Sequence, residues 1–229
     1  MECMSLLKMP TIPKIEANAL ATNAVQGGAL LERIVRRDRL ASLEQPCSHE
    51  INVQAKPADQ ERSGRCWLFA YVNVLRIRMI KKMKLPDTFQ LSQTYLYFYD
   101  KLERANTFLQ LMACMRDCPD DDRLLHYLCN PSIQDGGFHN YAEALVDKYG
   151  LVPYECMPDH FHSSNSRDLN EFLDRYLRSC AHDIRSSSDY DIPTMLSNVR
   201  HMLTVFLGEP PTQVNWRAYM GSKKQGRFR

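Results

Sequence analysis

The stretch from Gln60 to Ala70 carries the residue types and the spacing most suited to chemistry in this sequence. Cys66 follows a Ser63-Gly64 turn and precedes a long apolar run that is typical of a helix. A cysteine in the first turn of a helix lies beside unpaired backbone N–H groups, and the helix dipole there favours the thiolate over the thiol. Because the thiolate is the form that attacks a carbonyl carbon, the pattern predicts a nucleophile at position 66.

Gln60 lies six residues before Cys66, on the other side of the turn. Its side-chain amide is a donor of the kind that stabilises the oxyanion formed when a thiolate attacks a peptide carbonyl. The alternative is structural, because a single cysteine at the start of an apolar helix often packs as a small hydrophobic side chain. A nucleophile with an oxyanion donor and a buried structural cysteine are therefore the two interpretations of this stretch.

The elements that must position this stretch are expected to be mainly helical. The helix that carries Cys66 is expected to run to about Lys82, and Ser92 is a good N-cap for a second helix that runs to about Met115. Aromatic residues crowd the second helix between Tyr95 and Tyr99. We interpret them as a surface packed against the first helix, with a base-stacking platform as the alternative. Further helices are expected after Asp122 and at 18–43 (with Asn18 as N-cap), 141–149, 170–184 and 193–207, and a short strand is expected at 51–53.

Composition limits the class of protein. The chain has 229 residues, a hydrophobic share of 44% and a charged share of 24%, as in ordinary soluble globular domains. The net charge of +2 is made up of scattered acids and bases, which argues against a nucleic-acid binder. No window approaches the roughly 18 consecutive apolar residues of a membrane span, and residues 1–15 lack the apolar core of a secretion signal. We therefore expect a cytoplasmic protein without a membrane or nucleic-acid partner.

Two groups of residues raise the question of a metal. Cys114 and Cys118 stand four residues apart, and His160 and His162 stand beside Asp159. Neither group has further histidines or cysteines at the spacing of a zinc site. We therefore expect free thiols at the first group, a solvent-facing turn at the second, and no metal or other cofactor. The eight cysteines are expected to stay reduced.

Several segments resemble one peptidase family. Gln60 together with Ser-Gly-Arg-Cys-Trp at 63–67 resembles the active-site segment of papain-type cysteine peptidases, and specifically the bleomycin hydrolase branch. The resemblance covers residues 18–217, and it is weaker at 21–25 and 207–211. Its other matching segments are Leu-Ser-Gln at 91–93, Asp-Gly-Gly at 135–137 and Lys-Tyr-Gly-Leu-Val-Pro at 148–153.

The resemblance implies an α+β papain-like fold. This chain is expected to hold mainly the helical lobe and a helical insertion, without the β-rich C-terminal lobe. The implied organisation is a flexible leader at 1–17, the N-terminal lobe at 18–160, the insertion at 161–217 and a disordered basic tail at 218–229. The family also implies an aminopeptidase-like enzyme that acts on peptides and forms a hexamer-like homo-oligomer.

The resemblance also implies a substrate groove. It assigns Gly136, Gly137 and Trp67 to that groove, where glycine allows a peptide backbone to approach closely. Phe138 and His139 stand where the family usually has Gln-Trp, so the groove wall differs here.

A papain-type site also needs a histidine that activates the thiol and an asparagine that orients the imidazole. In the resembled family both belong to the C-terminal half, and none of the seven histidines here matches the position of the base. His139 falls in the groove region, and we assign no catalytic role to it. We therefore expect this chain to be inactive on its own.

Three hypotheses follow. The first is the front portion of a cysteine peptidase, with Cys66 as nucleophile. The second is a non-catalytic partner that assembles with full-length subunits. The third is a nucleic-acid or membrane-surface binder that uses the basic tail, and the low net charge argues most strongly against this one.

Overall fold

The structure is a computed structural model with two compact units, residues 1–51 and residues 52–229. In the first unit, the Gly27 N–H donates to the Asn23 carbonyl 2.9 Å away, as in a helical turn. The predicted leader, the N-cap at Asn18, most of the helical region 18–43 and the strand at 51–53 lie outside the described residues. The structure describes residues 22–23, 26–29, 55, 57–220 and 224–227.

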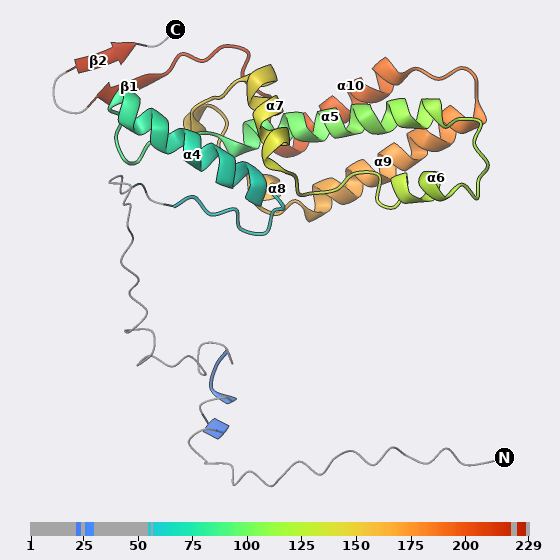
Figure 1. The fold of residues 1–229 in the computed structure, drawn as a ribbon, viewed down its shortest axis with the longest axis horizontal. Coiled ribbons are helices and arrows are strands. Elements are labelled where there is room, and N and C mark those ends of the chain that lie inside the picture. The colour runs from blue at the N-terminus through green and yellow to red at the C-terminus, as the bar shows by residue number, and fades with distance from the viewer. Residues whose placement is uncertain (1–21, 24–25, 30–54, 56, 221–223, 228–229) are drawn as a thin grey trace. The chain divides into compact units, whose positions relative to one another are not determined.

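The second unit is an assembly of helices followed by a small hairpin (Figure 1). Its elements are α4 (Cys66–Met83), α5 (Gln93–Cys114), α6 (Arg123–Leu128), α7 (His139–Tyr149), the 3-10 helix η1 (Tyr154–Cys156), α8 (Phe161–Ser164), α9 (Arg167–Ser186), α10 (Ile192–Leu207), β1 (Arg217–Met220) and β2 (Lys224–Arg227).

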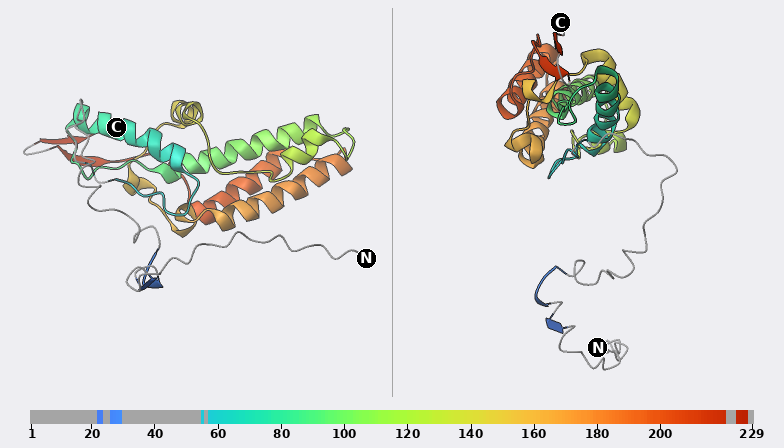
Figure 2. Two further views of the ribbon diagram at one scale, coloured as in Figure 1. Left: turned by 60° about the horizontal axis from the view of Figure 1, so that its bottom comes forward. Right: turned by 90° about the vertical axis from the view of Figure 1, so that its left-hand side faces the viewer.

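The central element is α5, which contacts α4, α7, α9 and α10. Ser92 caps its N-terminus: the Oγ atom accepts from the Tyr95 N–H at 3.1 Å and donates to the buried Met157 carbonyl at 2.5 Å. The predicted start of this helix is therefore confirmed, and its last residue lies one position before the predicted end. Both α9 and α10 run alongside α5 in every view (Figures 1 and 2).

The aromatic residues of α5 belong to the core. Tyr95, Tyr97 and Phe98 are all at most 6% exposed, so these rings are unavailable for stacking on bases. Tyr99 stacks on Tyr149 of α7 with ring centroids 3.8 Å apart, and Arg200 of α10 lies over the ring of Phe98. Packing inside the fold is thus confirmed, and it involves α7 and α10 in addition to α4.

Helix α4 begins at Cys66, as the sequence predicts, and ends at Met83, one residue beyond the predicted end. Lys84 then adopts a left-handed backbone conformation with φ of 53°, and its N–H donates to the Ile80 carbonyl. The apolar face of α4, which includes the fully buried Leu68 and Val72, packs against α5 and α7. The helix that begins with Cys66 is therefore held in place by its packing against α5 and α7.

Local signals also delimit α6 and α7. Asp122 accepts from the N–H groups of Leu124 and Leu125 at 2.8 Å and 3.0 Å, which starts α6 as predicted. Gly150, with φ of 77°, ends α7. The start of α7 lies at His139, two residues earlier than the sequence predicts.

Helices α9 and α10 pack on each other and on α5, and all three share one apolar core. The buried stripe of α9 has the spacing of an amphipathic helix, and it consists of Leu169, Leu173, Leu177, Cys180, Ala181 and Ile184. The predicted boundary at residue 160 between a papain-like lobe and a helical insertion stays a prediction. In the structure, α5, which precedes residue 160, packs against α9 and α10, which follow it.

Strands β1 and β2 pair antiparallel, with Arg217 opposite Arg227 and Met220 opposite Lys224. The disordered basic tail that the sequence predicts at 218–229 stays a prediction, and within it the structure describes residues 218–220 and 224–227. That prediction rested on the absence of an apolar pattern, whereas an antiparallel ladder is made by backbone hydrogen bonds and does not require one.

No helix among the described residues is long and apolar enough to cross a membrane. Helix α5, with 22 residues, has sufficient length, but it carries Asp100, Lys101, Glu103 and Arg104 in its middle.

Candidate active site

Cys66 is the first residue of α4, and its thiol is exposed and free of any disulfide. The N-cap residue, Arg65, makes no side-chain hydrogen bond to the first turn, and that turn contains no acidic residue. The N–H groups at the start of α4 therefore lack side-chain acceptors, so the helix end keeps its partial positive charge for an incoming anion. The interpretation of Cys66 as a buried structural cysteine is wrong.

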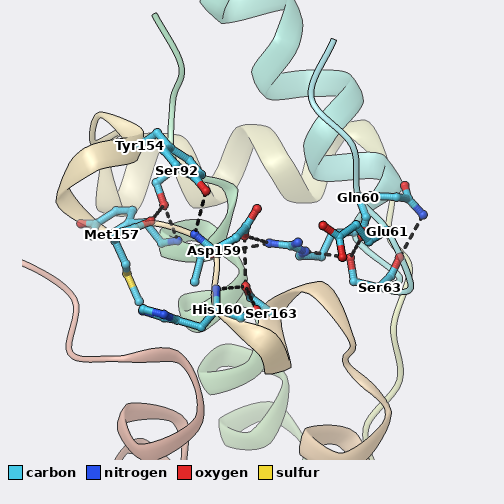
Figure 3. Close-up of polar contacts among 12 residues, drawn as sticks. Gln60, Glu61, Ser63, Ser92, Tyr154, Met157, Asp159, His160 and Ser163 are labelled. Atoms are coloured by element: carbon cyan, nitrogen blue, oxygen red, sulfur yellow. Dashed lines mark hydrogen bonds and ion pairs between the residues drawn. The ribbon is translucent and has the colours of Figure 1, made fainter. Parts of the chain in front are cut away.

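Gln60 lies at the other end of the same loop, half-buried. Its side-chain Nε2 atom donates to the backbone carbonyl of Ser63 at 2.9 Å. The backbone carbonyl of Gln60 accepts from the Ser63 hydroxyl at 2.7 Å (Figure 3). A primary amide has two N–H donors, so one remains after the bond to Ser63. The loop thus holds the Gln60 amide in place, and its role as oxyanion donor stays a prediction.

The Asp135-Gly136-Gly137 segment lies directly beside this loop. The Gly136 N–H donates to the Gly64 carbonyl at 3.1 Å, and a Cβ at position 64 would fall 2.2 Å from the Cβ of Asp135. Position 64 therefore has room only for glycine. Segments that stand far apart in the sequence meet here, as the family resemblance implies.

The two glycines of this segment serve different purposes. Gly136 has φ of 87°, a conformation that L side chains rarely adopt, and its carbonyl accepts from Arg104 at 2.6 Å. A Cβ at Gly137 would fall 2.7 Å from the indole ring of Trp67, which is only 8% exposed. The structure therefore brings Trp67, Gly136 and Gly137 together next to Cys66. Their function as a substrate groove stays a prediction.

Asp135 anchors the glycine segment through a buried polar network. Its carboxylate pairs with the buried Lys101 ammonium at 2.8 Å and accepts from the Tyr97 and Ser166 hydroxyls and the Asn170 amide at 2.6–2.9 Å. Burial by itself raises the pKa of this carboxyl, but the charge of Lys101 and the hydrogen bonds outweigh it and lower the pKa of Asp135 to about 2. This network is not among the features predicted from the sequence. The available signal was a lysine on the apolar face of α5, between Tyr97 and Ala105.

Arg65 and Asp159 form a second polar network, in which Asp159 lies beside Ser163 (Figure 3). The Arg65 side chain is fully buried, and its Nη1 atom lies 2.6 Å from Asp159 Oδ1. The Thr94 hydroxyl donates to the same oxygen at 2.5 Å, and the Ser163 hydroxyl lies 3.1 Å from it. The predicted solvent-facing turn is therefore wrong for Asp159, whose side chain is only 20% exposed because it neutralises a buried arginine.

The six described histidines occupy other environments. The ring of His139 packs edge-on against Tyr71 of α4 at 4.8 Å, His160 faces Gly208, and His162 lies against Phe161 and Phe206. The remaining three are His126, His182 and His201, on α6, α9 and α10. In this part of the chain, the Cys66 thiol has no hydrogen bond to a histidine.

Other candidate sites lie away from Cys66. Over the residues that the structure describes, no group of three or more His, Cys, Asp or Glu side chains is arranged to hold a metal ion. A cavity of about 560 Å³ lies between α5, α6 and α7, with Phe108, Leu111, Tyr127 and Tyr141 in its walls. Neither Cys66 nor Gln60 lines this cavity.

A match to a protein-family model shows to which proteins this chain is related. The model of the Peptidase C1-like family matches residues 11–227. The chain belongs to the Peptidase C1-like family. Aminopeptidase C of Listeria innocua is 38% identical over 177 residues, which are 75% of this chain and 40% of that protein. Bleomycin hydrolase of Oryctolagus cuniculus is 30% identical over 209 residues, which are 86% of this chain and 75% of that sequence.

A solved structure extends the likeness to the fold. PepW from Lactobacillus rhamnosis aligns with a TM-score of 0.81 at 32% identity, over 95% of this chain and 50% of that one. The predicted cysteine peptidase family and its papain-like fold class are thus confirmed, and this chain carries mainly helices of that fold. The chain spans about 40% of the length of the Listeria relative.

Proposed function

We propose that this chain supplies the nucleophile and the oxyanion donors of a cysteine peptidase that removes residues from peptide N-termini. The observation that carries the proposal is the position of Cys66, whose exposed thiol stands on the uncapped first residue of α4. The names of the relatives, aminopeptidase C and bleomycin hydrolase, support this class of reaction.

In the proposed reaction, the Cys66 thiolate attacks the carbonyl carbon of a peptide bond. An S–C bond forms while the carbonyl electron pair moves to oxygen, and that oxyanion accepts from the Cys66 N–H and the free N–H of Gln60 Nε2. The intermediate collapses by breaking the C–N bond, and the amine leaves with a proton. Water then hydrolyses the thioester to release the carboxylic acid.

The proton for the amine must come from an imidazole, and no described histidine is hydrogen-bonded to Cys66. By resemblance, that histidine belongs to the C-terminal half of the family. We therefore expect this chain to accept an acyl group on Cys66 and to hydrolyse amides only when an imidazole is supplied. The backbone of Gly136 and Gly137 is the proposed wall against which the substrate chain lies.

Selective alkylation tests the nucleophile. Cys114 is a matched control, because it is also exposed but stands at the C-terminus of α5 instead of at the start of a helix. We expect iodoacetamide to modify Cys66 about threefold to thirtyfold faster than Cys114 at pH 6–7, from opposite helix-end effects of about 0.3–1 kcal/mol each. Equal alkylation rates at the two cysteines, measured by peptide mass spectrometry, would remove the support for an activated thiol at Cys66.

An activated ester tests the acyl transfer itself. A p-nitrophenyl ester needs no proton for its leaving group, so Cys66 can form the S–C bond and release p-nitrophenolate without a histidine. We expect one equivalent of p-nitrophenolate per chain and a stable thioester at Cys66, and no burst from Cys66→Ser. An acyl group found on other cysteines at the same rate contradicts the proposal.

A second candidate function is a non-catalytic partner that assembles with full-length family members. The observation in its favour is a set of exposed apolar side chains on neighbouring helices, Phe161 of α8, Phe172 of α9 and Val205 of α10, which are 57–69% exposed. Sedimentation of this chain with a full-length relative tests it, and co-sedimentation lost in Phe172→Ser supports it. We place either function in the cytoplasm, in keeping with the free thiols of the six described cysteines.

A further inference from the structure

The residue that precedes the nucleophile helix is unusual for its position. Arg65 is the N-cap of α4, where Ser, Thr, Asp or Asn normally accepts a hydrogen bond from the first turn. A guanidinium has only donors and cannot do this. Instead the side chain turns inward and is completely buried, with its charge over the rings of Phe69 and Tyr97.

The contacts of Arg65 tie it to two other segments. Its Nε atom donates to the Ser63 hydroxyl at 2.8 Å, and its Nη1 atom donates to the Thr94 hydroxyl at 3.1 Å and to Asp159 at 2.6 Å. Its Nη2 atom is buried without a hydrogen-bond partner among the described groups. The carboxylate of Asp159 is therefore the anion that holds this buried charge. Burial raises the pKa of that carboxyl, but the charge of Arg65 and the hydrogen bonds from Arg65, Thr94 and Ser163 together outweigh burial and lower the pKa of Asp159.

This anchoring reaches the backbone at Cys66. The Arg65 carbonyl accepts from the Phe69 N–H at 3.0 Å, which is the first hydrogen bond of α4. Because the Arg65 side chain is held at its far end, its backbone is fixed without any side-chain acceptor at the N–H groups of the first turn. An ordinary cap would occupy those N–H groups, whereas the Arg65–Asp159 pair leaves them open.

We propose that Asp159 is a positioning residue for Cys66: through Arg65 it fixes the start of α4 and keeps the N–H groups there free for an anion. The usefulness of that geometry rests on the proposed function. The positioning itself is measurable on this chain whether or not Cys66 is a nucleophile.

Three variants separate positioning from simple stabilisation. Asp159→Asn removes the charge and nearly keeps the shape. The double variant Arg65→Met with Asp159→Leu removes the whole ion pair, and such apolar replacements are often neutral or stabilising. Asp174→Asn is the matched control. Asp174 is also a largely buried carboxylate, with its side chain 15% exposed. It pairs with Arg178 and Ser132, outside the loop at 60–65 that precedes Cys66.

Two readouts follow each variant, with urea unfolding as the measure of stability. The first is hydrogen exchange of the Phe69 amide relative to core amides of α5. The second is the alkylation rate of Cys66, for which loss of the helix-end effect gives a decrease of about twofold to fivefold. We expect Asp159→Asn and the double variant to show faster Phe69 exchange and slower Cys66 alkylation, and Asp174→Asn to show neither.

The double variant distinguishes positioning from stabilisation, because it leaves no unpaired buried charge and can therefore be measured even where Asp159→Asn fails to fold. If the double variant regains wild-type exchange at Phe69 together with its stability, the pair is purely structural and the proposal is overturned. If Cys66 of the wild type alkylates no faster than Cys114, the proposed function loses its support, and the exchange at Phe69 still decides the positioning.

Discussion

Gly137 lies against the indole of Trp67 so closely that a Cβ at position 137 would fall 2.7 Å from two ring atoms. The glycine segment is therefore in direct contact with α4, at the residue that follows Cys66. At Gly136 the reason for glycine differs, because the space around it is open and the requirement is its φ of 87°.

Replacement of Gly137 by alanine is expected to displace the Trp67 ring. Overpacking of this kind costs about 1–3 kcal/mol, so we expect a loss of that size in the free energy of unfolding, with a red shift of the Trp67 emission as the ring moves toward water. Urea titration followed by fluorescence measures both. Gly136→Asn is the comparison variant: a Cβ there meets no neighbour within 4 Å, so its cost comes from backbone strain at positive φ, which asparagine tolerates better than most residues, and the Trp67 emission should not shift. A Gly137→Ala variant as stable as the wild type contradicts the contact.

Asp135 is expected to make stability depend on acid pH. Its pKa is depressed from 3.8 to about 2 in the folded chain, so its contribution is complete above the unfolded pKa and is lost as pH falls from about 4 toward 2. The shift corresponds to about 2 kcal/mol. We expect the free energy of unfolding of the wild type to fall more steeply over this range than that of Asp135→Asn. Parallel pH profiles for the two proteins would show that the carboxylate is not held in this way.

Gln60→Ala is expected to slow acyl transfer and leave alkylation alone. Removal of one oxyanion donor from a complete site costs about 10²–10³ in rate, and we expect at least about a tenfold decrease in the acylation of Cys66 by a p-nitrophenyl ester. Alkylation by iodoacetamide passes through no oxyanion, so its rate serves as an internal control. A parallel decrease in both rates would mean that Gln60 acts through the shape of the loop and its bond to Ser63.

Ser92→Ala is expected to weaken the start of α5 severely. The change removes the acceptor for the Tyr95 N–H and leaves the buried Met157 carbonyl without its donor. We expect a loss of about 2–4 kcal/mol, from a cap of about 1 kcal/mol and an unsatisfied buried group of about 1–3 kcal/mol. Asp122→Ala at the partly exposed cap of α6 should cost no more than about 1 kcal/mol. Similar losses in the two variants, by urea unfolding, would contradict the buried bond to Met157.

Local signals in the sequence were sufficient for several of the helix boundaries, although α7 begins two residues and α9 three residues before the predicted starts. Ser92, Asp122 and Gly150 cap or stop helices through contacts with their near neighbours, so their effects are visible in a short window of sequence. Cys66 at the start of α4 was predicted for the same reason. The pairing of β1 with β2 was not predicted, because β2 (Lys-Gln-Gly-Arg) has no apolar residue from which a strand pattern could be recognised.

The two polar networks around the site were missed for a different reason. Arg65 and Asp159 stand 94 residues apart, and Lys101 and Asp135 belong to different elements. Charged residues are normally solvated, so burial of an arginine or a lysine depends on a partner that only the fold brings near. Lys101 gives a weak sequence signal of burial, because it is a charged residue on the apolar face of a helix. Arg65 precedes its helix, so the sequence gives no comparable signal that it is buried.

The position of α5 between two groups of helices has a consequence for any attempt to divide this molecule. On one side it supports α4 and α7, and on the other it is covered by α9 and α10. A shortened protein that stops after residue 160 would expose to water the surface of α5 that α9 and α10 cover. Helix α4, which carries Cys66, would then pack against a destabilised α5. Melting followed at Trp67 and by helical circular dichroism should therefore give a single shared transition.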